Sequence, residues 1–174
     1  MERIARFGVD VSINSTGVAF VIPKTETEDE KTLYFQICPW DEKVSASVRL
    51  LTYKRTYSDY EEYSEVDLHK VVSADNQARV VYKLLHEIAA QYNITSFDAR
   101  QEGSVLATSF KSKQSRINDL TIFNAAMKRM MLSCKLITSI SIIPPNSLKK
   151  YATGKGNCGK GLMEDVFYEK NPDF

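Results

Sequence analysis

Cysteine and histidine are scarce in this chain, which limits the sites that they can form. The three cysteines, Cys38, Cys134 and Cys158, lie far apart among 174 residues and form no CxxC pair. His69 and His86 are the only histidines, and neither has a Cys or His neighbour at the spacing of metal ligands. This pattern argues against a disulfide framework and against a zinc site. It is typical of reduced thiols in a cytosolic protein.

Long hydrophobic runs and an excess of charge are also missing. No apolar run approaches the roughly 18 residues that cross a bilayer, and no signal peptide opens the chain. The formal net charge is +1, so the chain as a whole gives no electrostatic argument for a nucleic-acid partner, and any basic surface must be local. We therefore expect a soluble, cytoplasmic protein with no membrane partner.

The apolar patterning, by contrast, is strong enough to predict a fold. The chain is 43% hydrophobic, which is enough for one sizeable core, so we expect a single domain over residues 1–174. Period-two alternation predicts strands, and apolar residues at three- and four-residue spacing predict helices. We expect, in order, strands at 4–11, 17–23 and 33–38, a helix at 75–92, a strand at 94–101, a helix at 117–132, a strand at 135–143, and helices at 146–151 and 160–168.

This order predicts an α/β fold. Its mixed sheet combines an antiparallel three-strand meander with parallel crossover strands and is flanked by helices. Ser73 or Asp75 is expected to cap the first long helix, and Asn93 to end it. Residues 41–70 lack a clear pattern, and we interpret them as an irregular or partly helical insertion at about 40–70. Its tyrosines at 53, 57, 60 and 63 are expected to pack or to form an interaction surface; the alternative is stacking on bases.

Residues 7–21 are the most informative part of the chain. An apolar run that contains Asp10 reaches a Ser/Asn/Thr/Gly turn and returns as a second apolar run, which predicts a β-hairpin with Asp10 near the end of its first strand. A carboxylate inside a core strand is costly unless its charge is offset, and a bound divalent cation offsets it. Asp10 is thus a candidate metal ligand. The alternative is a turn former bonded to nearby backbone N–H groups.

Glu102 ends the strand expected at 94–101 and faces Asp10 if the two strands are neighbours. Hard oxygen ligands of this kind suit Mg²⁺ or Mn²⁺, and two such ions roughly 4 Å apart activate a water and stabilise the leaving oxygen of a phosphodiester. Asp98 is a weaker candidate, because alternation places it on the same face but deeper. Glu102 also admits a simpler interpretation as a solvated charge at a strand end.

Three motifs resemble those of one family. Asp10-Val11-Ser12 with Thr16-Gly17 resembles the D-x-[SG]…TG opening of the RuvC-like Holliday junction resolvases, within the RNase H-like superfamily. Glu102-Gly103 looks like the second acidic motif of that family. Residues 145–160 are similar to its P-x-x-[LVI]-K-K-x-x-T-G-x-G-x-A-x-K segment, in the form seen in phage-type members. The resemblance spans most of the chain but leaves the insertion unmatched.

The resemblance implies an RNase H-like fold in which Asp10 and Glu102 ligate metal. It places four lysines near the scissile phosphate or the DNA backbone, with Lys160 or Lys155 steadying the phosphate: Lys149, Lys150, Lys155 and Lys160. Glycines in the loop at 153–159 let the backbone approach a phosphate; the alternative is a plain connection between helices. A second basic cluster after Glu102 is expected to track a DNA arm, and consists of Lys111, Lys113 and Arg116.

The chain departs from the family in its acidic set. The family completes its site with two more acids, usually D-x-x-D-A on a C-terminal helix, and no D-x-x-D occurs here. Cys158-Gly159 also replaces the usual small-residue pattern before Lys160. We expect either that the sequence lacks its C-terminal helix or that the protein has lost part of the catalytic set.

Two functions of different classes follow. The first is a phage-encoded, Mg²⁺- or Mn²⁺-dependent endonuclease of DNA recombination, a homodimer that nicks opposing strands of a four-way junction. The second is a catalytically incomplete protein of the same fold that serves as a binding or adaptor module, with phage proteins as partners. A structure-specific or RNA–DNA hybrid nuclease would share the chemistry of the first and differ only in substrate.

Overall fold

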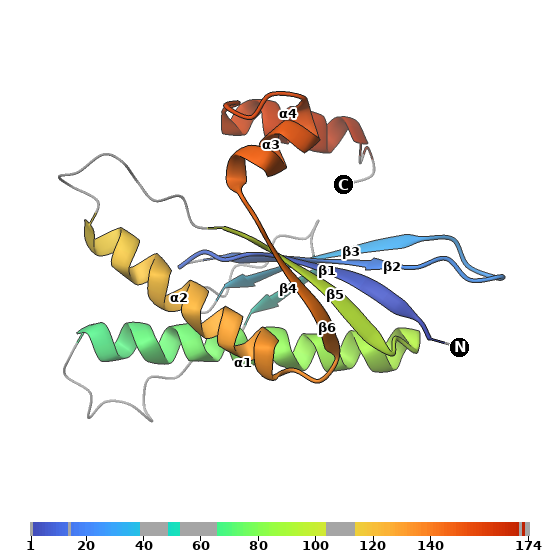
Figure 1. Cartoon of the computed structure of the whole chain (residues 1–174), viewed down its shortest axis with the longest axis horizontal. Coiled ribbons are helices and arrows are strands. Elements are labelled where there is room, and N and C mark those ends of the chain that lie inside the picture. Colours follow the sequence, from blue (N-terminus) through green and yellow to red (C-terminus); the bar gives the residue numbers. More distant parts are fainter. Residues whose placement is uncertain are drawn as a thin grey trace.

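A mixed sheet forms the centre of the protein. The computed structural model describes residues 2–13, 15–38, 49–52, 66–103, 114–170 and 172. Six strands lie in the order β4-β3-β2-β1-β5-β6 (Figure 1). They are β1 (Ile4–Asp10), β2 (Thr16–Ile22), β3 (Lys31–Cys38), β4 (Arg49–Thr52), β5 (Ser96–Glu102) and β6 (Ile137–Ile143). β1, β2 and β3 pair antiparallel, whereas β4 joins β3, β5 joins β1 and β6 joins β5 in parallel.

Helices lie on both sides of this sheet. The helices are α1 (Val66–Tyr92), α2 (Gln114–Ser133), α3 (Pro145–Thr153) and α4 (Lys160–Lys170). Figure 1 shows α1 and α2 together below the sheet and α3 and α4 above it. On the upper face, the ring of Phe167 in α4 meets that of Tyr34 in β3, with centroids 5.6 Å apart. We call the face of the sheet that packs against α1 and α2 the packed face, and the opposite face the open face.

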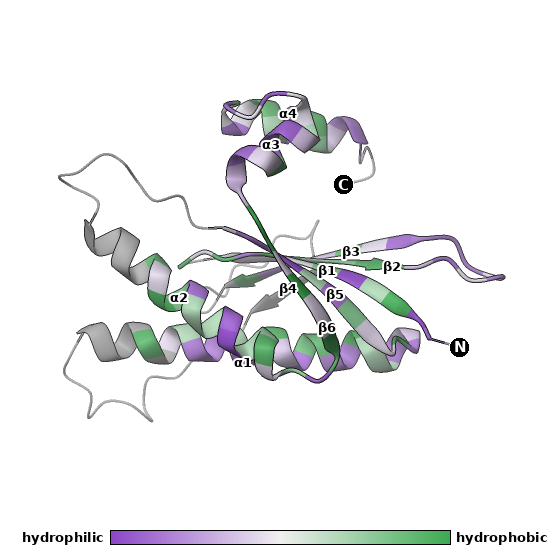
Figure 2. Cartoon of the chain, viewed as in Figure 1, coloured by the Kyte–Doolittle hydropathy of each residue, from purple (hydrophilic) through white to green (hydrophobic). Residues whose placement is uncertain are grey.

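Alternation along the strands builds the core on the packed face. Phe7, Phe20 and Phe97 are fully buried there, and the ring of Phe20 lies 5.2 Å from that of Phe7 and 5.7 Å from that of Phe97. Apolar residues of α1 and α2, such as Leu85 and Met127, complete the cluster. Figure 2 shows hydrophobic residues spread along α1, whereas α3 is mainly hydrophilic and has no buried residue. The hydrophobic effect therefore anchors the packed face of the sheet most firmly.

The expected α/β architecture with its three-strand meander and parallel strands is confirmed. Asn93 ends α1 as expected, with a left-handed φ of 52°, a conformation that asparagine tolerates better than most residues. Within the described parts of the chain, no helix has both the length and the apolar character needed to cross a membrane.

Two expectations need correction: residues 41–70 contain a strand as well as a helical part, and the first long helix does not begin at residue 75. β4 lies inside this segment. Its four residues carry no clear strand pattern, and it forms a strand because it pairs with β3. α1 begins at Val66, so neither Ser73 nor Asp75 caps it. Ser73 is instead buried inside the helix, and Asp75 forms ion pairs. The four tyrosines of the insertion lie outside the described residues.

Candidate functional site

Asp10 and Glu102 stand at the ends of neighbouring parallel strands. β1 pairs with β5 in a register that sets Val9 opposite Gln101, so the next position on each strand carries one of the two acids. Val9 and Gln101 are buried on the packed face. Because successive side chains of a strand point to opposite faces, both acids project on the open face. The expectation that these acids meet at one edge of the sheet is confirmed.

The two acids interact directly. Burial, the negative charge of Asp10 and a side-chain hydrogen bond with Asp10 together raise the pKa of Glu102 to about 7, against a smaller lowering by the positive charge of Lys149. Below about pH 7, Glu102 is therefore mainly protonated and shares its proton with Asp10. A divalent cation in place of that proton would neutralise both carboxylates and meet only hard oxygen ligands, so this pair fits Mg²⁺ or Mn²⁺.

The turn after Asp10 is held by two buried polar side chains. The Thr16 hydroxyl donates to the carbonyl of Ser12 and accepts from its N–H, both at 3.1 Å. Gln77 of α1 also donates to the Ser12 carbonyl through Nε2, at 3.1 Å. Thr16 is fully buried and Gln77 is 1% exposed. These contacts fasten the turn, so the side chain of Asp10 is not needed as a turn former.

A second buried amide pair supports the strand that carries Glu102. Nε2 of Gln101 donates to Oδ1 of Asn124 in α2, and Nδ2 of Asn124 donates to the carbonyl of Leu120 at 2.9 Å. Gln101 is fully buried and Asn124 is 6% exposed. Helices α1 and α2 thus each send one amide side chain toward a strand end that bears an acid, through Gln77 and Asn124. We call these two contacts the amide supports.

Gly103, the residue after Glu102, lies close to the backbone of β6. Its N–H donates to the carbonyl of Ile143 in β6 at 2.8 Å. A Cβ atom on Gly103 would lie 3.2 Å from Cγ2 of Ile142 and 3.4 Å from the Ile143 carbonyl oxygen, closer than most such atoms come. A glycine therefore lets β5 and β6 remain side by side up to the acid pair.

Helix α3 carries Lys149, whose charge acts on Glu102. The positive charge of Lys149 lowers the pKa of Glu102, although less than burial and Asp10 raise it. Lys150, Lys155 and Lys160 are exposed on the α3–α4 unit. No contact between Lys160 and either acid is seen in the part of the chain that the structure describes. We use "basic unit" for these four lysines, of which Lys149 is the one whose charge acts on Glu102.

The loop between α3 and α4 is tightly built. The Thr153 hydroxyl donates to the carbonyl of Lys149 at 2.8 Å and accepts from the N–H of Lys155 at 3.2 Å. Gly154 ends α3 in the left-handed conformation, with a φ of 76°. A Cβ on Gly156 would lie 3.1 Å from the carbonyl oxygen of Asn146, so the loop presses against the start of α3. Thr153 thereby links the position of Lys155 to the turn that carries Lys149.

Other predicted site residues lie elsewhere or outside the described ranges. Asp98 is on the same face as Glu102, as expected. Ser139 and Arg100 donate hydrogen bonds to its carboxylate and hold its pKa below the usual value. Lys111 and Lys113 lie outside the described residues, and Arg116 is described only in its backbone, within α2. The second basic cluster therefore stays a prediction.

Sequence patterns missed the amide supports as functional residues. A signal was present for Gln77, which interrupts an apolar helix face between Ala74 and Val81, and for Gln101, which occupies a core position of β5. A polar residue at a core position needs a hydrogen-bonding partner, and here the partners serve the strand ends that bear the acids. Among the described residues, no group of three or more His, Cys, Asp or Glu side chains gathers at one point.

Comparisons with known proteins agree with the fold. No family model matches the sequence, and no curated protein is similar to it at the level of sequence. The structure of Thermus thermophilus RuvC in complex with a Holliday junction substrate matches with a TM-score of 0.50 and 10% identity over 95% of this chain and 78% of that one. This chain therefore has a RuvC-like fold, an RNase H-like mixed sheet with helices.

Two further structures align with lower scores. Another Thermus thermophilus RuvC structure gives a TM-score of 0.48 at 10% identity, over 95% of this chain and 78% of that one. The Aquifex aeolicus Ppx/GppA phosphatase gives 0.38 at 11% identity, over 88% of this chain and 39% of that one.

Proposed function

We propose that this protein is a Mg²⁺- or Mn²⁺-dependent endonuclease that nicks branched DNA, with a four-way junction as its substrate. The observation that carries the proposal is the contact between Asp10 and Glu102 at adjacent strand ends, on which the charge of Lys149 also acts. Two carboxylates that share a proton form a site ready for a divalent ion. The RuvC-like fold and the junction bound in the Thermus thermophilus structure support the choice of substrate.

The residues of this chain would divide the work as follows. Asp10 and Glu102 hold the ion, which when bound supplies activation of a water and stabilisation of the leaving oxygen. Lys149 balances the charge of the acid pair, and Lys155 and Lys160 neutralise the phosphate without reading sequence. Thr153 keeps the spacing between Lys149 and Lys155 constant.

The arrangement of the whole enzyme belongs to the same proposal. Two copies related by a two-fold axis would present two acid pairs to a junction of similar symmetry, so we propose a homodimer. We also propose a phage-encoded protein, because residues 145–160 have the phage-type form of the resolvase segment. Further carboxylates would join the acid pair from outside the described residues.

The test is a nicking assay on a labelled four-way junction in Mg²⁺. Asp10→Asn and Glu102→Gln should each slow cleavage by more than about 100-fold, because even partners outside the metal's ligands commonly change metal affinity or activity ~10–100-fold. Both variants should still bind the junction. The matched control is Asp98→Asn, which changes an acid of the same strand face that Ser139 and Arg100 already occupy, and it should keep most of the activity.

The other functions make different predictions in the same assay. An adaptor protein of this fold would bind the junction but leave it uncut with every divalent ion. A nuclease of other substrates would prefer a flap or an RNA–DNA hybrid over the junction, and its activity would still depend on Asp10. Cleavage that is unchanged in Asp10→Asn would remove the acid pair from the reaction.

A further inference from the structure

A groove runs between α1 and α2 on the side of these helices that faces away from the sheet. It has a volume of about 240 Å³, and its apolar lining comes from Ala78, Tyr82, Ala126 and Met130. A cavity of about 150 Å³ accommodates benzene, so this groove has room for one large apolar side chain. The two helices that form it lie on the opposite side of the sheet from α3 and α4 (Figure 1).

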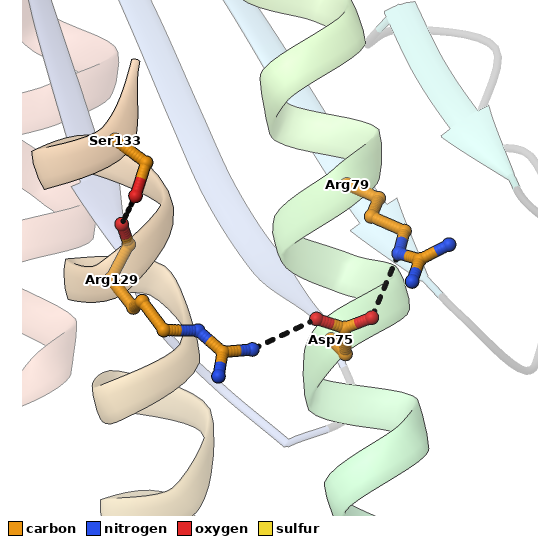
Figure 3. Close-up of polar contacts among 4 residues, drawn as sticks. All are labelled: Asp75, Arg79, Arg129 and Ser133. Atoms are coloured by element: carbon orange, nitrogen blue, oxygen red, sulfur yellow. Dashed lines mark hydrogen bonds and ion pairs between the residues drawn. The ribbon is translucent and has the colours of Figure 1, made fainter.

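Two guanidinium groups meet one carboxylate at the edge of the groove. Oδ2 of Asp75 accepts from Nε of Arg79 at 2.7 Å, and Oδ1 accepts from Nη2 of Arg129 at 3.2 Å (Figure 3). The side chains of Arg79 and Arg129 are 73% and 76% exposed. Each guanidinium has five N–H donors and uses one on Asp75, so most donors remain available for a second carboxylate.

The charge around the groove is positive although the chain is almost neutral. Among the residues that line the groove, Arg79 and Arg129 are basic and Asp75 is acidic. Asp75 offsets only one of the two guanidinium charges at the groove. A partner that carries negative charge is therefore complementary to this surface.

We propose that the α1–α2 groove binds an acidic peptide segment of a partner protein, with one apolar side chain in the groove and flanking carboxylates on Arg79 and Arg129. Tyrosine, methionine and arginine, which line this groove, are enriched at protein interfaces. Nucleic acid fits less well, because phosphates would engage the arginines but leave the apolar groove empty. The ion pairs of these arginines with Asp75 are of the kind that a carboxylate of a partner would form.

The test uses a fluorescein-labelled synthetic peptide in which one Phe and one Leu are flanked by Asp residues, titrated with the full chain and read by fluorescence anisotropy. Saturable binding is expected. Arg129→Glu should weaken it at least about tenfold, because it turns an attraction into a repulsion. Lys128→Glu is the matched control, since it makes the same change of charge on the next residue, which does not line the groove, and should change binding less than about twofold.

A second variant tests whether the apolar groove itself is needed for peptide binding. Ala126→Trp fills the groove and keeps every charge, so it should abolish peptide binding, and circular dichroism would confirm that the variant folds. Binding that survives Ala126→Trp would overturn the proposal, as would absence of binding to the wild-type chain. A duplex DNA that displaces the peptide and binds Arg129→Glu at least tenfold more weakly would assign the groove to nucleic acid. Loss of a dimer in Arg129→Glu, measured by light scattering, would assign it to a second copy.

Discussion

The two faces of the central sheet use the same strands for opposite purposes. On the packed face, Phe7, Phe20 and Phe97 are fully buried against each other and against α1 and α2. On the open face, the same strands end in Asp10 and Glu102, which repel each other unless they share a proton or a cation. Each acid is adjacent in sequence to a buried residue. The comparison shows that the packed face supplies the rigidity that holds two mutually repelling groups together.

The largest effect is expected from a cavity on the packed face. Phe20→Ala should lower the free energy of unfolding by about 3–5 kcal/mol, because it removes a fully buried ring that three other aromatic rings contact. Tyr34→Ala, on the open face, is the control and should cost clearly less, because Tyr34 is only partly buried. Urea denaturation measures both, and equal losses would contradict the distinction between the faces.

A smaller effect is expected where the packed face supports the open one. Asn124→Leu leaves the side chain of Gln101 buried without its partner, so the strand end that bears Glu102 loses its amide support. Affinity for Mn²⁺, measured by calorimetry, should fall about tenfold, as for partners that orient metal ligands. Ser133→Ala, a change at an exposed position of the same helix, should leave the affinity unchanged. An unaltered Mn²⁺ affinity in Asn124→Leu would show that the amide supports are structural only.

The acid pair should make stability depend on pH when divalent ions are removed by a chelator. The pKa of Glu102 is raised from 4.5 to about 7 in the folded protein, so the folded state keeps a proton that the unfolded state releases. The stabilisation is complete below pH 4.5 and is lost as the pH rises through about 7. Thermal melts should show this decline, and Glu102→Gln should reduce it. A profile that Glu102→Gln leaves unchanged would refute the shared proton.

The smallest effect is expected at Gly17, which lies opposite Asp10 in the hairpin. A Cβ at this position would meet only Cβ of Asp10, at 3.9 Å, an ordinary contact. Gly17→Ala should therefore change the free energy of unfolding by less than about 0.5 kcal/mol. The neighbouring Thr16→Val, which removes the hydroxyl bonded to Ser12, should cost more, by about 1–3 kcal/mol. A reversed order in chemical denaturation would contradict this account of the turn.

Local patterns in the sequence predicted the elements that carry the site. The hairpin at residues 7–21 and the strand that ends at Glu102 follow from alternation and turn chemistry, which act over a few residues. The proximity of the two acids followed once these strands were taken as neighbours. β4 escaped prediction because it has four residues and owes its order to pairing with β3.

Contacts between distant segments were the part that the sequence did not reveal. Gln77 and Ser12 are 65 positions apart, and Gln101 and Asn124 are 23 apart, so no local spacing signals either hydrogen bond. The sequence pattern also did not predict the start of α1 at Val66. Its first turns do not continue the clear apolar repeat that begins near residue 75. The basic clusters were visible as composition, but only the folded structure shows that the charge of Lys149 acts on Glu102.

The parallel pairing of β1 with β5 has a consequence for the lifetime of the protein. Asp10 belongs to the amino-terminal hairpin, and Glu102 enters the sheet only after α1 has crossed over. An ion bound by both acids would crosslink these two portions of the native state. Its binding would stabilise the native state by an amount that increases with the concentration of free ion. At low concentrations of that ion, the protein would therefore lose both its activity and part of its stability against unfolding.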